Sequence, residues 1–140
     1  MSDNFSFPVR VYYEDTDAGG VVFYANYLKF MERARTEWLR QMGIEQDVLT
    51  QEQAIVFAVR RIKVDYLKPA RFNEQLDVTV QVKKCNNASL DFYQEVRRAG
   101  LKSGEVLCKA DVQIACVDVV RFVPRRIPEN IIMELKNRGV

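Results

Sequence analysis

The stretch YEDTDAGGVVFYANYLKFMERARTEWLRQM, residues 13–42, runs from a polar, glycine-bearing loop straight into an amphipathic segment. In its second half the apolar side chains recur every three or four residues, and the charged ones lie mostly off that stripe. The pattern predicts one long helix of about four turns. Asn26 is a candidate for its N-terminal cap and Gly43 for its end. We expect Phe30 and Trp38 on the buried face of this helix.

Behind the helix the hydrophobic period changes to two, which is typical of β-strands. Four runs alternate in this way: residues 62–66, 76–82, 90–96 and 108–116. Turn residues separate them, at Pro69, at Asn86 and between residues 99 and 104. These short links favour antiparallel neighbours. The alternation slips at Arg60 and Arg61, which predicts a bulge.

The remaining segments complete the order of elements. Residues 7–13 alternate like an opening strand, and residues 44–53 form a polar connector between the helix and the later strands. A short closing helix is expected after Pro128. A helix with one apolar face and strands with one apolar face can bury each other. The sequence therefore predicts a single α+β domain over residues 1–140, with an antiparallel sheet wrapped on one central helix.

Composition and charge exclude several classes of function. The 140 residues include three cysteines and no histidine, so histidine triads and histidine metal sites are excluded and no metal is expected. The net charge of +2 comes from 21 basic and 19 acidic residues that are interspersed, which argues against nucleic-acid binding. The chain has no apolar run long enough to span a membrane and no signal-like start, so we expect a cytoplasmic protein with reduced thiols.

The loop of residues 14–20, EDTDAGG, is the first place to look for chemistry. Asp15 and Asp17 face the same way if this segment is extended, and the glycines let a ligand approach the backbone. The first amides of the following helix lack internal partners and carry the positive end of its dipole. A carboxylate beside such amides suits attack on an activated acyl group. The alternative is a solvated turn, because acidic residues followed by Gly-Gly are common in turns.

Other polar residues have ordinary structural interpretations beside the functional ones. Tyr24 suits packing near the helix start as well as it suits contact with a ligand. Glu32 and Arg35 are three residues apart on a helix, which favours a local ion pair. The basic stretch RFVPRR, residues 121–126, suits either phosphate binding or a solvated edge. The residues alone leave these alternatives open.

The stretch YEDTDAGGVVFYANYLKFMERAR, residues 13–35, resembles the signature of the 4-hydroxybenzoyl-CoA thioesterase family, in its YbgC-like acyl-CoA thioesterase subgroup. The resemblance extends through AIVFAVRRIKVDYLKPARFNEQL, residues 54–76, and CVDVVRFVPRRIP, residues 116–128. It therefore covers essentially the whole chain. It implies the hotdog fold, in which a curved antiparallel β-sheet wraps around a long central α-helix, as a single thioesterase domain.

The resemblance also implies a site. Asp17, the second aspartate of the D-T-D triplet, is the expected catalytic carboxylate, acting as nucleophile or general base. The backbone amide at or near Tyr24 is expected to polarise the thioester carbonyl. The site is expected between the subunits of a homo-oligomer, either a dimer or a homotetramer, and to need no cofactor. Many YbgC-like sequences carry histidine where this chain has Tyr24, so Asp17 must perform the proton chemistry alone or through water.

The predicted function is hydrolysis of an acyl-CoA thioester to a free acid and CoA. Short aliphatic, long aliphatic and aromatic acyl groups all stay open as substrates. The alternative is a non-catalytic hotdog protein that binds acyl groups or acyl carrier protein, or that serves a Tol-Pal-linked envelope assembly. A hotdog hydratase or dehydratase normally uses a histidine base, which this chain lacks.

Overall fold

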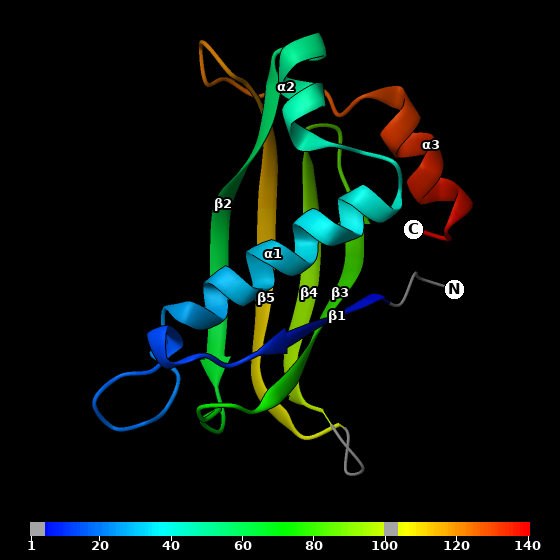
Figure 1. Ribbon diagram of the computed structural model, residues 1–140. Coiled ribbons are helices and arrows are strands. Elements are labelled where there is room, and N and C mark those ends of the chain that lie inside the picture. The colour runs from blue at the N-terminus through cyan, green and yellow to red at the C-terminus, as the bar shows by residue number, and fades with distance from the viewer. Residues whose placement is uncertain (1–4, 100–103) are drawn as a thin grey trace.

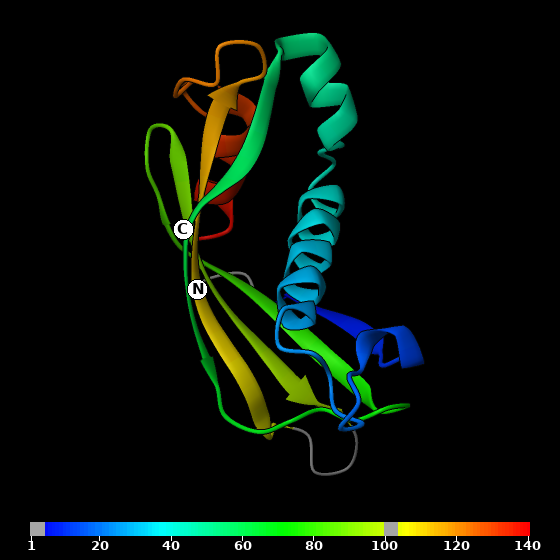
Figure 2. The same cartoon turned by 90° about the vertical axis from the view of Figure 1, so that its left-hand side faces the viewer.

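Five antiparallel strands and one long helix dominate the structure, a computed structural model that describes residues 5–99 and 104–140. The strands are β1 (Phe5–Arg10), β2 (Ile55–Tyr66), β3 (Gln75–Cys85), β4 (Ser89–Arg98) and β5 (Val106–Asp118). They form one sheet in the order β1-β3-β4-β5-β2, so β1 and β2 are its edges. Figure 1 shows α1 (Asn26–Gln41) across one face of this sheet, and Figure 2 shows the sheet curving around the helix. The predicted order of strand, long helix and four strands is confirmed.

The core lies between α1 and the concave face of the sheet. Inward side chains alternate with outward ones along β3, and the inward Leu76 and Val78 are fully buried. Phe30 and Trp38 of the helix are fully buried as well, as predicted. The rings of Trp38 and Phe92 meet edge to face with 5.3 Å between their centroids. Each such side chain stabilises the fold by roughly 1.5–3 kcal/mol on leaving water, so the helix and the sheet hold each other in place.

Three register shifts shape the sheet. The predicted one is confirmed in β2, where the pairing with β5 shifts between Val59 and Arg61. A second lies in β3, where the pairing with β4 shifts between Val82 and Lys84, and a third lies where β4 pairs with β5, between Val96 and Arg97. Bulges of this kind bend a strand and increase its local twist, which suits a sheet that wraps a helix. The turn predicted between residues 99 and 104 lies partly outside the described residues.

The structure departs from the predicted elements at two places. The opening strand stops at Arg10, earlier than expected, because Tyr13–Asp15 form a turn of 3-10 helix. The expected polar connector contains a second helix, α2 (Gln46–Gln53). Only Leu49 of this helix is buried, so its sequence carries no apolar stripe that would reveal it. The closing helix is confirmed as α3 (Glu129–Asn137).

The packing of Trp38 yields a test of the core. Trp38→Ala should lower the free energy of unfolding by about 3–5 kcal/mol, because the fully buried ring leaves a cavity. Urea denaturation followed by circular dichroism measures this loss. Val120→Ala is the matched control, since Val120 is 84% exposed and should change stability by less than about 0.5 kcal/mol. Similar losses in both variants would contradict the assignment of the core.

Candidate active site

Asp17 lies in a small hairpin that joins the end of the 3-10 turn to α1. Thr16 pairs with Val22 across it, and the Asp17 amide donates to the Val21 carbonyl at 3.0 Å. The Gly20 amide donates back to the Asp17 carbonyl at 3.0 Å, which closes a turn of four residues. Gly20 has φ +76°, a left-handed conformation that glycine adopts without strain. The glycines of the loop therefore have a definite geometric role.

The Asp17 carboxylate is exposed and only partly engaged by the turn. Its Oδ1 accepts a hydrogen bond from the Gly19 amide at 2.8 Å, the usual contact of an aspartate that opens a turn. A Cβ on Gly19 would lie 3.2 Å from that oxygen, so the carboxylate occupies the space that the missing side chain leaves. The Oδ2 atom receives no hydrogen bond from residues 5–99 or 104–140. The turn thus uses one carboxylate oxygen and leaves the other available.

Asp15 has a different environment, and the prediction that it faces the same way as Asp17 is wrong. The segment is a 3-10 turn at this point instead of an extended strand, and it places Asp15 at 8% exposure. Its Oδ2 accepts from the Tyr12 amide at 2.9 Å and its Oδ1 from the Asn26 side-chain amide at 3.1 Å. Asp15 therefore ties the loop to the first residue of α1.

The expected cap of the helix also needs correction. Asn26 is the first residue of α1 itself, and its side chain reaches back to Asp15 instead of capping the helix. The residue before it, Ala25, has no side chain that can cap, and the first turn holds no acidic residue. The positive end of the helix dipole is therefore left without a compensating charge on its own first turn.

Tyr24 lies just before the start of α1. Its backbone amide donates to no acceptor in the described part of the chain, while its carbonyl accepts from the Tyr66 hydroxyl at 3.0 Å. Its ring is 63% exposed. The described residues contain no hydrogen bond between Asp17 and Tyr24, the two predicted site residues.

An aromatic cleft of about 250 Å³ opens beside Tyr24. It is lined by Val22, Tyr24, Tyr27, Tyr66, Leu67, Lys68 and Pro69. The rings of Tyr27 and Tyr66 lie 5.6 Å apart, and burial raises the pKa of both phenols, so both stay protonated at neutral pH. Sequence reasoning missed Tyr66 as a site residue, although its place at the end of a strand was a usable signal.

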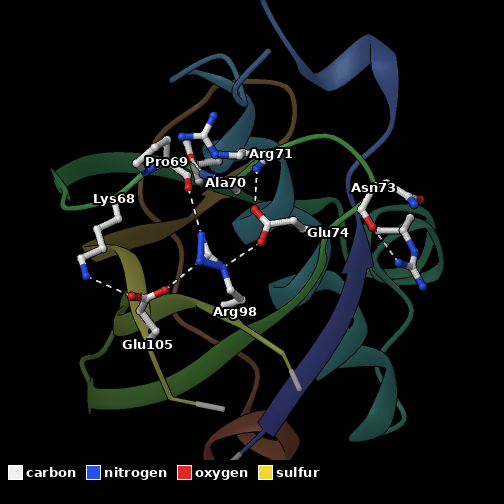
Figure 3. A network of polar contacts seen from close by, with 10 residues as sticks. Lys68, Pro69, Ala70, Arg71, Asn73, Glu74, Arg98 and Glu105 are labelled. Atoms are coloured by element: carbon white, nitrogen blue, oxygen red, sulfur yellow. Dashed lines mark hydrogen bonds and ion pairs between the residues drawn. The ribbon is translucent and has the colours of Figure 1, made fainter. Parts of the chain in front are cut away.

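A network of charged residues holds the connection between β2 and β3 beside this cleft (Figure 3). The guanidinium of Arg98 in β4 pairs with Glu105 at 2.7 Å and with Glu74 at 2.8 Å. It also donates to the Pro69 carbonyl at 3.2 Å, and Lys68 pairs with Glu105 at 3.0 Å. One arginine therefore joins three separate segments of the chain.

The same connection carries the backbone groups that position the hairpin and the helix start. The Ala70 carbonyl accepts from the Val22 amide at 2.8 Å, and the Ala70 amide donates to the Tyr27 hydroxyl at 2.9 Å. The Asn73 amide donates to the Val11 carbonyl at 2.9 Å. No short sequence motif signals this support, because its members come from α1, β4 and several separate loops.

Other candidate groups lie apart from this region or are unreactive at neutral pH. Burial raises the pKa of the Cys108 thiol to about 12, so it stays protonated and is no nucleophile at neutral pH. The described residues contain no group of three acidic, cysteine or histidine side chains that could hold a metal. Within those residues no helix is long and apolar enough to cross a bilayer. The basic stretch of residues 121–126 lies at the far end of the molecule from the hairpin (Figure 1), where Arg125 pairs with Asp118 at 3.0 Å.

The contacts of Asp15 predict a structural effect for a mild substitution. In Asp15→Asn the new side-chain NH2 group faces a donor, either the Tyr12 amide or the Asn26 side-chain amide, and one hydrogen bond is lost. The free energy of unfolding should therefore fall by about 1–3 kcal/mol. Thermal or urea unfolding measures the loss. Asp47→Asn is the control, because among the described residues the exposed Asp47 carboxylate accepts from the neighbouring Val48 amide alone. Unchanged stability in Asp15→Asn would contradict its assignment as the tie between the loop and α1.

Comparison with known proteins agrees with the fold and identifies the family. The chain matches the model of the Thioesterase-like superfamily over residues 11–135. It is 46% identical over 132 residues to the acyl-CoA thioesterase YbgC of Haemophilus influenzae, with 94% of each protein covered. It is 42% identical over 132 residues to the acyl-CoA thioester hydrolase YbgC of Escherichia coli O157:H7, covering 94% of this chain and 96% of that protein. A probable thioesterase from Bartonella henselae has a similar structure, with a TM-score of 0.84 and 30% identity over 90% of this chain and 100% of that one. The predicted hotdog fold and family resemblance are confirmed, and the chain belongs to the Thioesterase-like superfamily.

Proposed function

We propose that this protein hydrolyses acyl-CoA thioesters to a free acid and CoA, with Asp17 as the reacting carboxylate. The observation that carries the proposal is the half-engaged Asp17 carboxylate, exposed in the turn of a hydrogen-bonded hairpin that leads into the start of α1. The relatives named YbgC, at 42% and 46% identity, support the reaction class. The enzyme works in the cytoplasm as a single domain of residues 1–140, without a cofactor.

Two routes lead to the same products. As a general base, Asp17 takes a proton from water while the water oxygen attacks the thioester carbon. As a nucleophile, the free Oδ2 of Asp17 attacks that carbon and forms an anhydride, which water then hydrolyses. In both routes the C–S bond breaks, the CoA sulfur leaves as thiolate and takes a proton, and the acid is released.

The start of α1 supplies the stabilisation of charge. The carbonyl oxygen of the thioester becomes negative as the tetrahedral intermediate forms, and backbone amides at a helix start stabilise such charge. The Tyr24 amide has no acceptor within the described residues, and the Tyr66 hydroxyl holds the adjoining carbonyl at 3.0 Å. Tyr24 therefore contributes its backbone, and the histidine that many YbgC-like sequences carry at this position is not needed for that role.

The proposed site lies between copies of the chain. Asp17 and Tyr24 share no hydrogen bond within the described residues, and β2 at one edge of the sheet offers a means of association. A long edge strand without proline can pair with another strand, whereas a proline hinders such pairing. β2 has 12 residues and no proline, and the opposite edge, β1, is a strand of 6 residues that contains Pro8. We infer a homo-oligomer in which β2 of one copy faces β2 of another. It is either a dimer or a tetramer formed by two dimers.

Association can be measured without any substrate. Light scattering on the purified protein should give a mass of at least twice the 16.3 kDa of one chain. Val59→Lys should shift the equilibrium toward smaller species, because Val59 on β2 is 52% exposed in one chain and a charge there is costly to bury. Val120→Lys, far along the chain in an exposed loop, is the control. A parent protein that stays monomeric at high concentration would contradict the inference.

The reaction is tested by release of free CoA thiol from a panel of short, long and aromatic acyl-CoAs. Asp17→Asn should keep the fold, because an asparagine oxygen can still accept from the Gly19 amide, yet lose most hydrolysis, because the amide neither attacks nor takes a proton well. Asp15→Asn should reduce turnover less than Asp17→Asn does, when turnover is expressed per folded molecule.

Asp47→Asn serves as the control for loss of an exposed carboxylate, and its turnover should match the parent. If Asp17→Asn is as active as the parent, the proposed mechanism is wrong. If no thioester is hydrolysed by the parent, the non-catalytic alternative, binding of acyl carrier protein or a Tol-Pal-linked assembly, is favoured over catalysis.

A further inference from the structure

Arg35 is a buried cation without a buried anion to pair with. It lies on α1 with 7% exposure. The contact ion pair expected with Glu32 is wrong, since no carboxylate of the described residues comes within 4.0 Å of Arg35. The Glu32 carboxylate accepts from the Thr36 hydroxyl at 2.9 Å and acts on Arg35 through its charge at longer range. Buried charges are normally paired, because the removal of an ion from water is costly.

The neutral side chain of Gln94 holds Arg35 in position. Gln94 in β4 is fully buried, and its amide donates to the carbonyls of Met31 at 3.1 Å and Thr79 at 3.3 Å. Its oxygen is thereby directed toward Arg35, whose Nη1 donates to it at 2.8 Å. A guanidinium has five N–H donors, and this bond is the one that the described residues provide for Arg35. Burial lowers the pKa of Arg35, which reflects the cost of this environment.

Arg35 opens onto a cleft of about 450 Å³ between α1 and the β2 edge. Leu39, Phe57, Val59 and Ile114 form the apolar part of its wall, and Glu32, Thr36 and Gln46 lie at its polar part. Apolar walls with a few oriented polar groups are typical of ligand sites. The cleft follows the same seam between α1 and β2 as the aromatic cleft beside Tyr24, which lies at the start of the helix. Arg35 lies nine helical steps beyond Asn26, a rise of about 14 Å along the helix axis.

We propose that Arg35 binds a carboxylate at the far end of the acyl group, so that ω-carboxyacyl-CoA thioesters are a preferred substrate class of this enzyme. The inference rests on the proposed function, because the thioester end must reach Asp17 while the other end enters this cleft. A carboxylate matches the planar fork of a guanidinium and neutralises its charge. A methyl terminus leaves the guanidinium with Gln94 as its one hydrogen-bond partner among the described residues.

Matched pairs of CoA thioesters test the proposal. Each pair has the same number of carbons and differs in its terminus, for example hexanoyl with adipoyl and dodecanoyl with dodecanedioyl. The ratio of kcat/KM for carboxylate to methyl terminus is measured over a series of lengths. At the length that spans the seam, the parent should favour the carboxylate by roughly tenfold or more, the usual effect of a hydrogen bond to a charged group. A ratio at or below one at every length overturns the proposal.

Variants assign the preference to the residue. Arg35→Gln should reduce this ratio roughly tenfold or more, and Arg35→Lys should retain part of it, because lysine keeps the charge and loses the fork. Arg33→Gln is the matched control, since Arg33 is an exposed residue of the same helix that does not line the cleft, and its ratio should equal that of the parent. An unchanged ratio in Arg35→Gln overturns the proposal. If Arg35→Gln does not fold, the test uses the ratio of the parent and that of Arg35→Lys. A lysine variant with the full ratio of the parent then overturns the role of the guanidinium fork.

A binding experiment separates this proposal from the proposed function. Calorimetry with free dicarboxylates, and with monocarboxylates of equal length, should show tighter binding of the dicarboxylates by the parent and loss of that difference in Arg35→Gln. Hydrolysis that depends on Asp17 but shows no preference for a charged terminus refutes the role of Arg35 and leaves the thioesterase function standing. Absence of all hydrolysis refutes the thioesterase function, and with it the substrate class proposed here, even if dicarboxylates bind.

Discussion

The long helix α1 packs its apolar stripe against the concave face of the sheet, and this packing determines where the site can lie. Phe30 and Trp38 are fully buried against the strands, so α1 cannot slide or rotate without returning both rings to water. The first residue of α1 is thereby fixed at one end of the sheet. The hairpin that carries Asp17 is joined to that point by backbone pairing and by the Asp15 carboxylate. A surface loop thus receives a precise position from packing that takes place elsewhere in the molecule.

The periodicity of hydrophobic residues and the positions of turn residues were sufficient to predict most of this architecture. The alternation of the later strands, the slip near Arg61 and the apolar stripe of the long helix all reflect burial of one face, which leaves a direct trace in the sequence. Helix α2 leaves no such trace, because it buries Leu49 alone. The side chain of Asn26 was assigned to a cap because caps are local, whereas its actual partner is Asp15, eleven residues away. Parts of the site that depend on neighbouring residues in the sequence could be predicted. Contacts between side chains that are distant in the sequence could not be predicted.

The two interpretations of the acidic loop proved compatible. A turn needs one acceptor atom from the aspartate at its first position, and the Gly19 amide takes Oδ1 of Asp17 for this purpose. Catalysis needs one oxygen that is free to attack or to take a proton, and a carboxylate has a second oxygen. The residue types D-A-G-G therefore could not distinguish a turn from a catalytic loop, because one aspartate has an oxygen for each role. What distinguishes them is the chemistry of the second oxygen, which asparagine lacks.

Arg35 illustrates the limit of local rules most clearly. An arginine three residues after a glutamate suggests an ion pair on a solvated helix face, but that rule holds for exposed side chains. The orientation of the Arg35 side chain depends on Gln94, which is 59 residues away in the sequence and fully buried. Apolar residues of similar volume often stabilise a core better than buried charges do. A cation held in place by one neutral amide therefore lowers the stability of the isolated chain, and an anion that enters the adjoining cleft would offset that cost. The cleft, the unpaired donors and the fixed orientation of the guanidinium together make a ligand carboxylate the simplest source of that anion.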